Sequence, residues 1–166
     1  MKKLIIALTM VAGLSVVAAN DTNNTLDSEQ WTLSLAGQGA TTTKSDSRTA
    51  FGAEISVGHV ADIILPGEIG FRQNFARTEN LTFGTTKLYS DWTVLNVKPV
   101  EFLIGGNAGV AYGDSSPIWT ISPELVTKVH IKRDVWLFGR LEYPFDIDEN
   151  ATKNLLTYTI GVGVKF

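Results

Sequence analysis

Residues 156–166 read LTYTIGVGVKF, an unbroken alternation of apolar side chains with polar or small ones. The apolar set takes every second position from Leu156 to Phe166, and the polar or small set takes the positions between them. Successive side chains of an extended strand point to opposite faces. This period of two therefore predicts a strand with one apolar face and one polar face.

The same alternation recurs upstream in seven further segments, and turn-forming residues separate them. Pro, Gly, Asn, Asp, Ser and Thr gather in the joints, where their backbone preferences and short polar side chains favour turns. From residue 31 onward there is no helical periodicity and no apolar run of membrane-spanning length. The sequence therefore predicts eight strands, at residues 31–36, 51–58, 69–75, 87–94, 102–112, 119–129, 135–143 and 156–166.

The composition excludes several classes of protein. The 166 residues include no cysteine, which excludes a disulfide scaffold, a thiolate zinc site and a thiol nucleophile. Only 19% of the residues are charged, and the net charge is −3 with a pI near 5.3, whereas a nucleic-acid binder usually presents a basic patch. We therefore expect one folded domain that binds no nucleic acid.

The N-terminus has the organisation of a secretory signal peptide. Lys2 and Lys3 precede an apolar run, and the small residue Ala19 ends it. The alternative, a membrane anchor, fits less well because the run is shorter than the roughly 20 apolar residues that a spanning helix needs. We predict a signal peptide at residues 1–19 and a flexible periplasmic segment at residues 20–30. Cleavage would remove both lysines and change the net charge from −3 to −5.

An even number of antiparallel strands can close into a barrel and leave no free edge. The apolar face would point inward in a soluble, lipocalin-like barrel and outward toward lipid in an outer-membrane barrel. Here the apolar face is nearly free of charge, and the opposite face combines glycine and serine with isolated charges, which suits a narrow interior. We therefore predict an all-β fold: an eight-stranded antiparallel up-and-down transmembrane β-barrel over residues 31–166. Its membrane-facing aromatic girdle would comprise Trp31, Phe51, Phe75, Trp92, Phe102, Tyr112, Trp119, Tyr143 and Tyr158.

Charges on the polar face are nearly balanced, with five acids and four bases: Glu54, Glu68, Asp91, Glu124 and Glu142 against Arg72, Lys87, Lys128 and Arg140. An unpaired charge in a tight lumen would cost several kcal/mol, so near balance indicates a paired network. Neighbouring strands suggest the pairs Glu54–Arg72 and Glu124–Arg140. We interpret the network as a polar plug that closes the barrel in place of a hydrophobic core.

The signal peptide, the eight alternating strands and the final strand together resemble small bacterial outer-membrane β-barrels of the OmpA and OmpX type. In that class a C-terminal phenylalanine on an alternating strand is the signal for the barrel-assembly machinery, and the matching residues here are Tyr158, Ile160, Val162, Val164 and Phe166. The resemblance covers residues 31–166. It implies an integral outer-membrane location and a monomer, with the lipid bilayer, lipopolysaccharide and the assembly machinery as partners.

The resemblance also implies an alternative to the plug, since the lumen of the OmpA barrel holds a charged gate. Exchange of partners in such a gate would open a narrow ion-conducting pore. Full-length OmpA proteins carry a further peptidoglycan-binding domain that this sequence lacks, so we expect no anchoring to the cell wall.

Some barrels of this size act on lipid A, which requires a nucleophile with a histidine and a carboxylate near the outer leaflet. The two histidines, His59 and His130, fall on the expected periplasmic side, and neither has a serine two residues later. Asp146, Asp148 and Glu149 lie in an expected outer loop without EF-hand spacing, which is typical of a solvated loop. We therefore expect no enzyme, no cofactor and no metal site. The predicted function is structural or interactive, with an extracellular ligand at the outer loops; the ion pore and a lipid A-modifying enzyme are the alternatives.

Overall fold

The computed structural model describes residues 30–42, 49–62, 65–77, 82–113, 117–146 and 155–166. The predicted signal peptide lies outside these residues, as does the predicted periplasmic segment up to residue 29. Gln30 is described, and its carbonyl accepts a hydrogen bond of 2.9 Å from the amide of Val60. In the described ranges, no helix has the length and hydrophobicity needed to cross a membrane.

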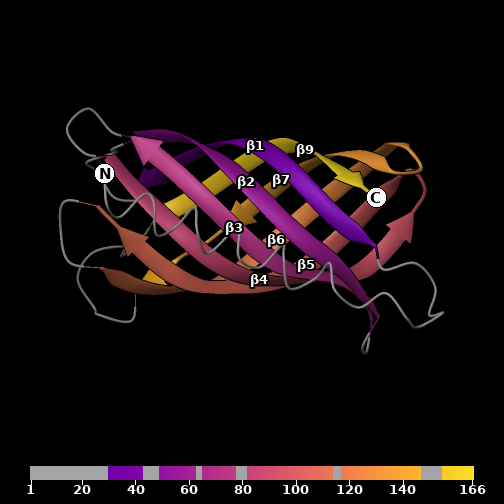
Figure 1. Cartoon of the computed structure of the whole chain (residues 1–166), viewed down its shortest axis with the longest axis horizontal. Coiled ribbons are helices and arrows are strands. Elements are labelled where there is room, and N and C mark those ends of the chain that lie inside the picture. Colours follow the sequence, from indigo (N-terminus) through magenta and orange to yellow (C-terminus); the bar gives the residue numbers. More distant parts are fainter. Residues whose placement is uncertain (1–29, 43–48, 63–64, 78–81, 114–116, 147–154) are drawn as a thin grey trace.

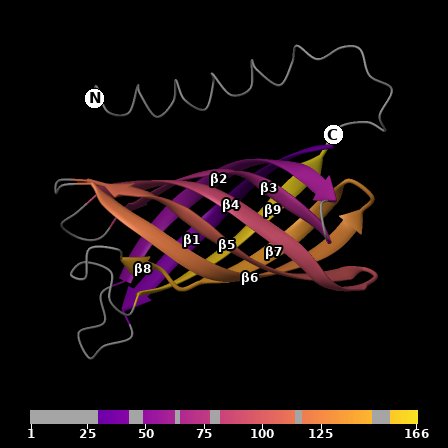
Figure 2. The same ribbon diagram turned by 90° about the horizontal axis from the view of Figure 1, so that it is seen from below.

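Antiparallel strands make up nearly all of the described chain. They are β1 (Trp31–Thr42), β2 (Thr49–Asp62), β3 (Pro66–Arg77), β4 (Thr82–Val97), β5 (Val100–Tyr112), β6 (Ile118–Lys132), β7 (Val135–Glu142), β8 (Phe145–Asp146) and β9 (Leu155–Lys165). Each long strand pairs with the next along the chain, and β9 pairs with both β7 and β1. The sheet therefore closes into the cylinder seen from two sides in Figures 1 and 2. The predicted eight-stranded antiparallel up-and-down barrel is confirmed.

The ninth element is a continuation of β7 rather than an additional strand of the wall. Pro144 has no amide hydrogen and interrupts the ladder, although the amide of Tyr143 still donates to the carbonyl of Pro123 at 3.2 Å. Pairing with β6 resumes at β8, where Phe145 lies opposite Ile121. The predicted strand ended at residue 143, so β8 extends it beyond the proline.

The two ends of the barrel differ in their connections. The β2–β3, β4–β5 and β6–β7 turns lie at one end, which we call the short-turn end (Figure 1). Trp31 and Phe166 lie at this end and exchange two backbone hydrogen bonds of 3.0 Å. The other four connections join strands at the opposite end, which we call the loop end; most of their residues lie outside the described ranges.

Burial in the barrel is the inverse of burial in a soluble protein. The outward side chains of Leu35 and Ile160 are 61% and 72% exposed, whereas the inward Glu54 and Glu142 are 1% exposed. Alternation places each set on its own face of the wall, because successive side chains of a strand point in opposite directions. The apolar face therefore lies outside and the charged face inside, as predicted for the transmembrane closure.

One irregularity changes the outward pattern on β4. The register with β5 shifts between Thr93 and Leu95, which leaves Val94 as an extra residue in a bulge. Both Val94 and Leu95 are consequently about half exposed, at 50% and 51%. The sequence predicted the outward position of Val94 but not the bulge that also turns its neighbour outward.

A small apolar layer occupies the lumen near the start of β7, where both faces of the strand carry apolar residues. Trp136 and Phe138 are only 5% and 7% exposed and cluster with Ala36 of β1. On the adjacent strand β9, a Cβ atom at Gly163 would collide with the ring of Trp136, and one at Gly161 would collide with that of Phe138. The two glycines therefore provide the space in which these rings fit.

Candidate functional site: the charged lumen

The nine charged side chains proposed for the interior point into the barrel from five of its strands. Inward positions recur at every second residue, and the closed wall shields these side chains from solvent. Eight of them are at most 7% exposed, and the side chain of the ninth, Lys128, is 13% exposed. The structure thus brings together all nine residues proposed for the interior, which we call the lumen network: Glu54 (β2), Glu68 and Arg72 (β3), Lys87 and Asp91 (β4), Glu124 and Lys128 (β6), Arg140 and Glu142 (β7).

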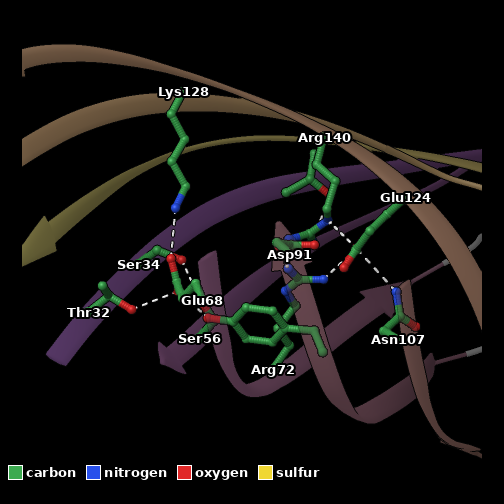
Figure 3. A network of polar contacts seen from close by, with 12 residues as sticks. Thr32, Ser34, Ser56, Glu68, Arg72, Asp91, Asn107, Glu124, Lys128 and Arg140 are labelled. Carbon is green, nitrogen blue, oxygen red and sulfur yellow. Dashed lines mark hydrogen bonds and ion pairs between the residues drawn. The ribbon is translucent and has the colours of Figure 1, made fainter. Parts of the chain in front are cut away.

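Arg72 joins three strands within the lumen network (Figure 3). Its Nη2 lies 2.7 Å from Asp91 Oδ2, and its Nη1 donates to Glu124 Oε2 at 2.5 Å. The guanidinium carbon also lies 3.7 Å from the ring centroid of Tyr89, which is a cation–π distance. Asn107 Nδ2 donates to the same Glu124 oxygen at 3.2 Å. One arginine therefore connects β3, β4 and β6 through two carboxylates.

Arg140 forms a second junction that shares Glu124 with the first. Its Nη2 donates to Glu54 and, at 3.3 Å, to Thr159 Oγ1, while its Nε lies 3.6 Å from Glu124 Oε2. The pair expected between Glu124 and Arg140 is present. The pair expected between Glu54 and Arg72 is wrong, because Glu54 reaches across the lumen to Arg140 on a strand that is not its neighbour. A narrow eight-stranded interior brings such distant strands within reach of one side chain.

The remaining charges form two further groups. Glu68 accepts hydrogen bonds from Lys128 Nζ at 2.7 Å and from Thr32 Oγ1 at 2.7 Å, and it also accepts one from the hydroxyl of Tyr89. Lys87 forms an ion pair with Glu142. Through these contacts every strand except β8 contributes a side chain to the lumen network or to a direct partner of it, including Thr32 from β1, Asn107 from β5 and Thr159 from β9.

The lumen network contains more hydrogen-bond acceptors than its own donors satisfy. Five carboxylates of the network face four cations. Among the network and its partner Asn107, five buried oxygens and two buried nitrogens have no hydrogen-bond partner in the described residues: Glu54 Oε1, Asp91 Oδ1, Asn107 Oδ1, Glu124 Oε1, Glu142 Oε2, Arg72 Nε and Arg140 Nε. Buried polar atoms of this kind are the positions at which ordered water binds in proteins. The arrangement can therefore hold the strands together electrostatically and bind water between them.

Four uncharged members of this site were missed in the sequence: Thr32, Tyr89, Asn107 and Thr159. All four occupy inward positions of their strands, so the alternation did indicate which face they share. An uncharged polar residue on that face gives no indication of the carboxylate or cation that it reaches, because the contact depends on strand register and on side-chain length.

Aromatic residues of the predicted girdle lie at outward positions. Phe51 and Trp119 are the most exposed of them, at 66% and 60%. Phe71 and Phe145, which the prediction omitted, are also exposed, and the ring of Phe145 packs 5.0 Å from that of Tyr143. The residues of the proposed assembly signal also face outward, with exposures between 36% for Val164 and 72% for Phe166. The roles of both sets stay predictions.

Gln73 is a polar residue on the outward face of β3, between Phe71 and Phe75, and neighbouring side chains of the wall cover it. Its side chain is 6% exposed, and its amide donates to the hydroxyl of Tyr112 at 2.5 Å and to the carbonyl of Thr85 at 3.1 Å. Thr86 Oγ1 donates to Gln73 Oε1 at 2.6 Å. These partners satisfy the amide within the wall, which removes the cost of exposing it to hydrocarbon.

Both histidines lie at the short-turn end. The ring of His59 packs edge-on against Trp31 at 5.1 Å, and His130 Nε2 lies 3.2 Å from Glu101 Oε2. Across the part of the chain that the structure describes, no group of three or more His, Cys, Asp or Glu residues could hold a metal ion. Asp148 and Glu149 of the acidic loop lie outside the described residues.

Comparison with known proteins identifies the fold. No protein-family model matches the sequence, and no curated protein matches it. Among solved structures, Neisserial surface protein A (NspA) superimposes with a TM-score of 0.62 at 14% identity, over 81% of this chain and 95% of that chain. Ail, the attachment invasion locus protein of Yersinia pestis, gives 0.55 at 12% identity, over 83% and 99%. The N-terminal β-barrel domain of OprF from Pseudomonas aeruginosa gives 0.55 at 13%, over 84% and 100%.

These similarities agree with the closed ladder, the exposed apolar wall and the charged interior. At such low sequence identity they establish architecture alone. The chain has the fold of the small eight-stranded outer-membrane β-barrels, like NspA, Ail and the OprF barrel domain.

Proposed function

We propose that this protein is an integral outer-membrane barrel with a structural or surface-interaction role, and that the lumen network closes its interior. The observation that carries the proposal is the inverted burial of the wall. Glu54 and Ile55 are adjacent in sequence, yet the glutamate is 1% exposed and the isoleucine 43%. A continuous apolar exterior around buried charges is stable where hydrocarbon, not water, surrounds the barrel.

The segments at the loop end are the proposed interaction surface, because loops on a rigid scaffold commonly carry binding specificity. NspA is a surface protein and Ail an attachment invasion locus protein, which supports a surface role for a chain of the same fold. The proposed partners are the lipid bilayer, lipopolysaccharide, the barrel-assembly machinery at the last strand and an extracellular ligand at the loop end. The proposed state is a monomer after export by the signal peptide.

Electrophoresis of the membrane fraction with and without boiling tests the membrane barrel. We expect the unboiled protein to migrate differently from the boiled chain, because a closed ladder leaves no strand edge from which the detergent can open it. The protein should be absent from the soluble fraction of the cell. A chain that is freely soluble and compact without detergent, with Tyr158 and Val162 shielded inside it, would contradict the proposal.

A narrow ion-conducting pore is the second candidate, since Arg140 already has two carboxylate partners, Glu54 and Glu124, between which it could exchange. If the lumen network is a plug, the protein should not conduct in planar lipid bilayers. Arg140→Ala and Glu54→Ala should then leave the conductance at baseline. A reproducible rise in either variant, with a selective reversal potential, would favour the pore.

We also propose that the barrel is not a lipid A-modifying enzyme. Acyl chemistry in the outer leaflet would require a histidine near the loop end, and His59 and His130 pack against Trp31 and Glu101 at the short-turn end. Lipid A from cells that express the protein should therefore keep its acyl pattern, as judged by mass spectrometry. A new or missing acyl chain would support the enzyme.

A further inference from the structure

Four cations form an arc along part of the rim at the short-turn end. Lys98 lies in the β4–β5 turn, Lys132 and Arg133 lie in the β6–β7 turn, and Lys165 ends β9. We call these four residues the basic arc. In Figures 1 and 2 the β4–β5 hairpin, the β6–β7 hairpin and the end of β9 emerge from the same end of the cylinder.

Backbone hydrogen bonds hold these three segments side by side. The carbonyl of Pro99, next to Lys98, accepts a hydrogen bond of 2.8 Å from the amide of His130, two residues before Lys132. The amide of Lys165 donates to the carbonyl of Asp134 at 2.8 Å, so the end of β9 lies directly beside the β6–β7 turn. The basic arc is therefore one continuous feature of the rim.

The cations of the arc are available to a partner. Lys98, Lys132 and Arg133 are exposed, and no ion pair joins any of them to another residue of the described ranges. Lys165 differs from them, because it occupies an inward position of β9 opposite Thr32 and has an acidic neighbour, Asp134, at 4.0 Å, so the three turn residues carry the site. The rest of the rim is different, since residues 59–67, which contain the β2–β3 turn, include no lysine or arginine.

The basic arc directly continues the apolar exterior. On β4, Leu95 and Val97 are 51% and 58% exposed and lead into Lys98; on β6, Ile131 is 58% exposed and precedes Lys132. A surface that changes from apolar to cationic within one or two residues matches the boundary between hydrocarbon and headgroups. A nucleic acid or an acidic protein would match the cations but not the adjoining apolar wall.

We propose that the basic arc binds the phosphate headgroups of anionic phospholipids in the leaflet at the short-turn end. The proposal rests on the membrane location proposed above. Lysine and arginine bind phosphate oxygens through charge-assisted hydrogen bonds, and two neighbouring hairpins carry Lys98, Lys132 and Arg133 at the same end of the barrel. Attraction of one Lys or Arg to an anionic membrane surface corresponds to roughly a fivefold preference for the charged lipid.

Retention of lipid by the purified barrel tests this site. The protein is reconstituted in vesicles of equal parts phosphatidylcholine and phosphatidylglycerol, extracted in mild detergent, and the lipids that stay bound are quantified by native mass spectrometry. We expect the wild type to retain phosphatidylglycerol over phosphatidylcholine by about fivefold or more. The triple variant Lys98→Gln, Lys132→Gln, Arg133→Gln should retain the two lipids about equally.

Arg77→Gln is the matched control, because Arg77 is an exposed cation at the loop end of β3 and lies outside the arc. It should keep the wild-type enrichment. If the triple variant does not fold, wild-type retention at 1 M against 0.05 M salt replaces it, and high salt should abolish the enrichment. Equal retention of both lipids by the wild type, or enrichment unchanged in the triple variant or at high salt, would overturn the inference. A wild type that does not insert into vesicles would instead overturn the membrane barrel itself.

Discussion

Replacing Arg72 with alanine should lower the free energy of unfolding by about 3–5 kcal/mol. The guanidinium contacts Asp91 at 2.7 Å and Glu124 at 2.5 Å, and all three side chains are nearly inaccessible to solvent. Its removal leaves two carboxylates close together in a lumen that already holds more acids than bases. Urea titration of the barrel in phospholipid vesicles, followed by tryptophan fluorescence, measures the loss.

Two further variants separate the loss of the buried ion pairs of Arg72 from a general effect of removing an arginine. Arg77→Ala removes an exposed cation from the same strand and should change the free energy of unfolding by no more than about 0.5 kcal/mol. Adding Asp91→Asn to Arg72→Ala should recover part of the loss, because it removes the charge of Asp91, whose ion-pair partner among the described residues is Arg72, whereas Glu124 keeps Arg140. Equal losses in Arg72→Ala and Arg77→Ala would contradict a stabilising role for the lumen network.

Arginine in place of Ile160 should cost about 2–4 kcal/mol in the same vesicles. Ile160 lies near the middle of β9 and is 72% exposed, so in the proposed membrane its side chain contacts hydrocarbon near the bilayer centre. A guanidinium there must either enter the apolar layer or bend away to reach the headgroups. The measurement is again urea unfolding, with heat-modified migration on gels as the check that the variant is inserted.

Ile131→Arg is the control for depth. Ile131 is similarly outward and 58% exposed, but it adjoins the basic residues at the short-turn end. Near the interface the cost of arginine falls to roughly 0–1 kcal/mol. In a soluble barrel neither change would be costly, because both side chains would be in water. A neutral Ile160→Arg variant would therefore contradict the membrane orientation.

Which side chains share a face of each strand could be predicted from backbone geometry, and the distribution of charge then indicated which face lies inside. A side chain two residues along a strand returns to the same face, so the outward position of Ile160 and the inward position of Glu54 required no knowledge of register. Closure of the sheet by a ladder between the first and last strands was also predicted, because an even number of antiparallel strands can close into a barrel. The bulge at Val94 and the extension of β7 through β8 depend on local hydrogen bonding around Thr93 and Pro144, which alternation does not encode.

The membership of the lumen network was predictable for the same reason, but its pairing was not. Glu54 is bound by Arg140 rather than Arg72 because the three side chains meet in the interior, where distance around the wall no longer decides the partner. Gln73 illustrates the same limit on the outer face. Its burial depends on Tyr112 of β5, a strand that does not pair with β3.

The ladder between β1 and β9 has a consequence for how the barrel forms. It joins residues 32–42 to residues 155–165, so the wall cannot close until the chain is available from β1 through β9. Until then the open sheet has two edge strands with unpaired backbone groups, which can pair with strands of other chains. Under the membrane location proposed above, these edges would have to stay protected until β9 pairs with β1. Truncations that remove β9 should therefore yield aggregates rather than smaller barrels.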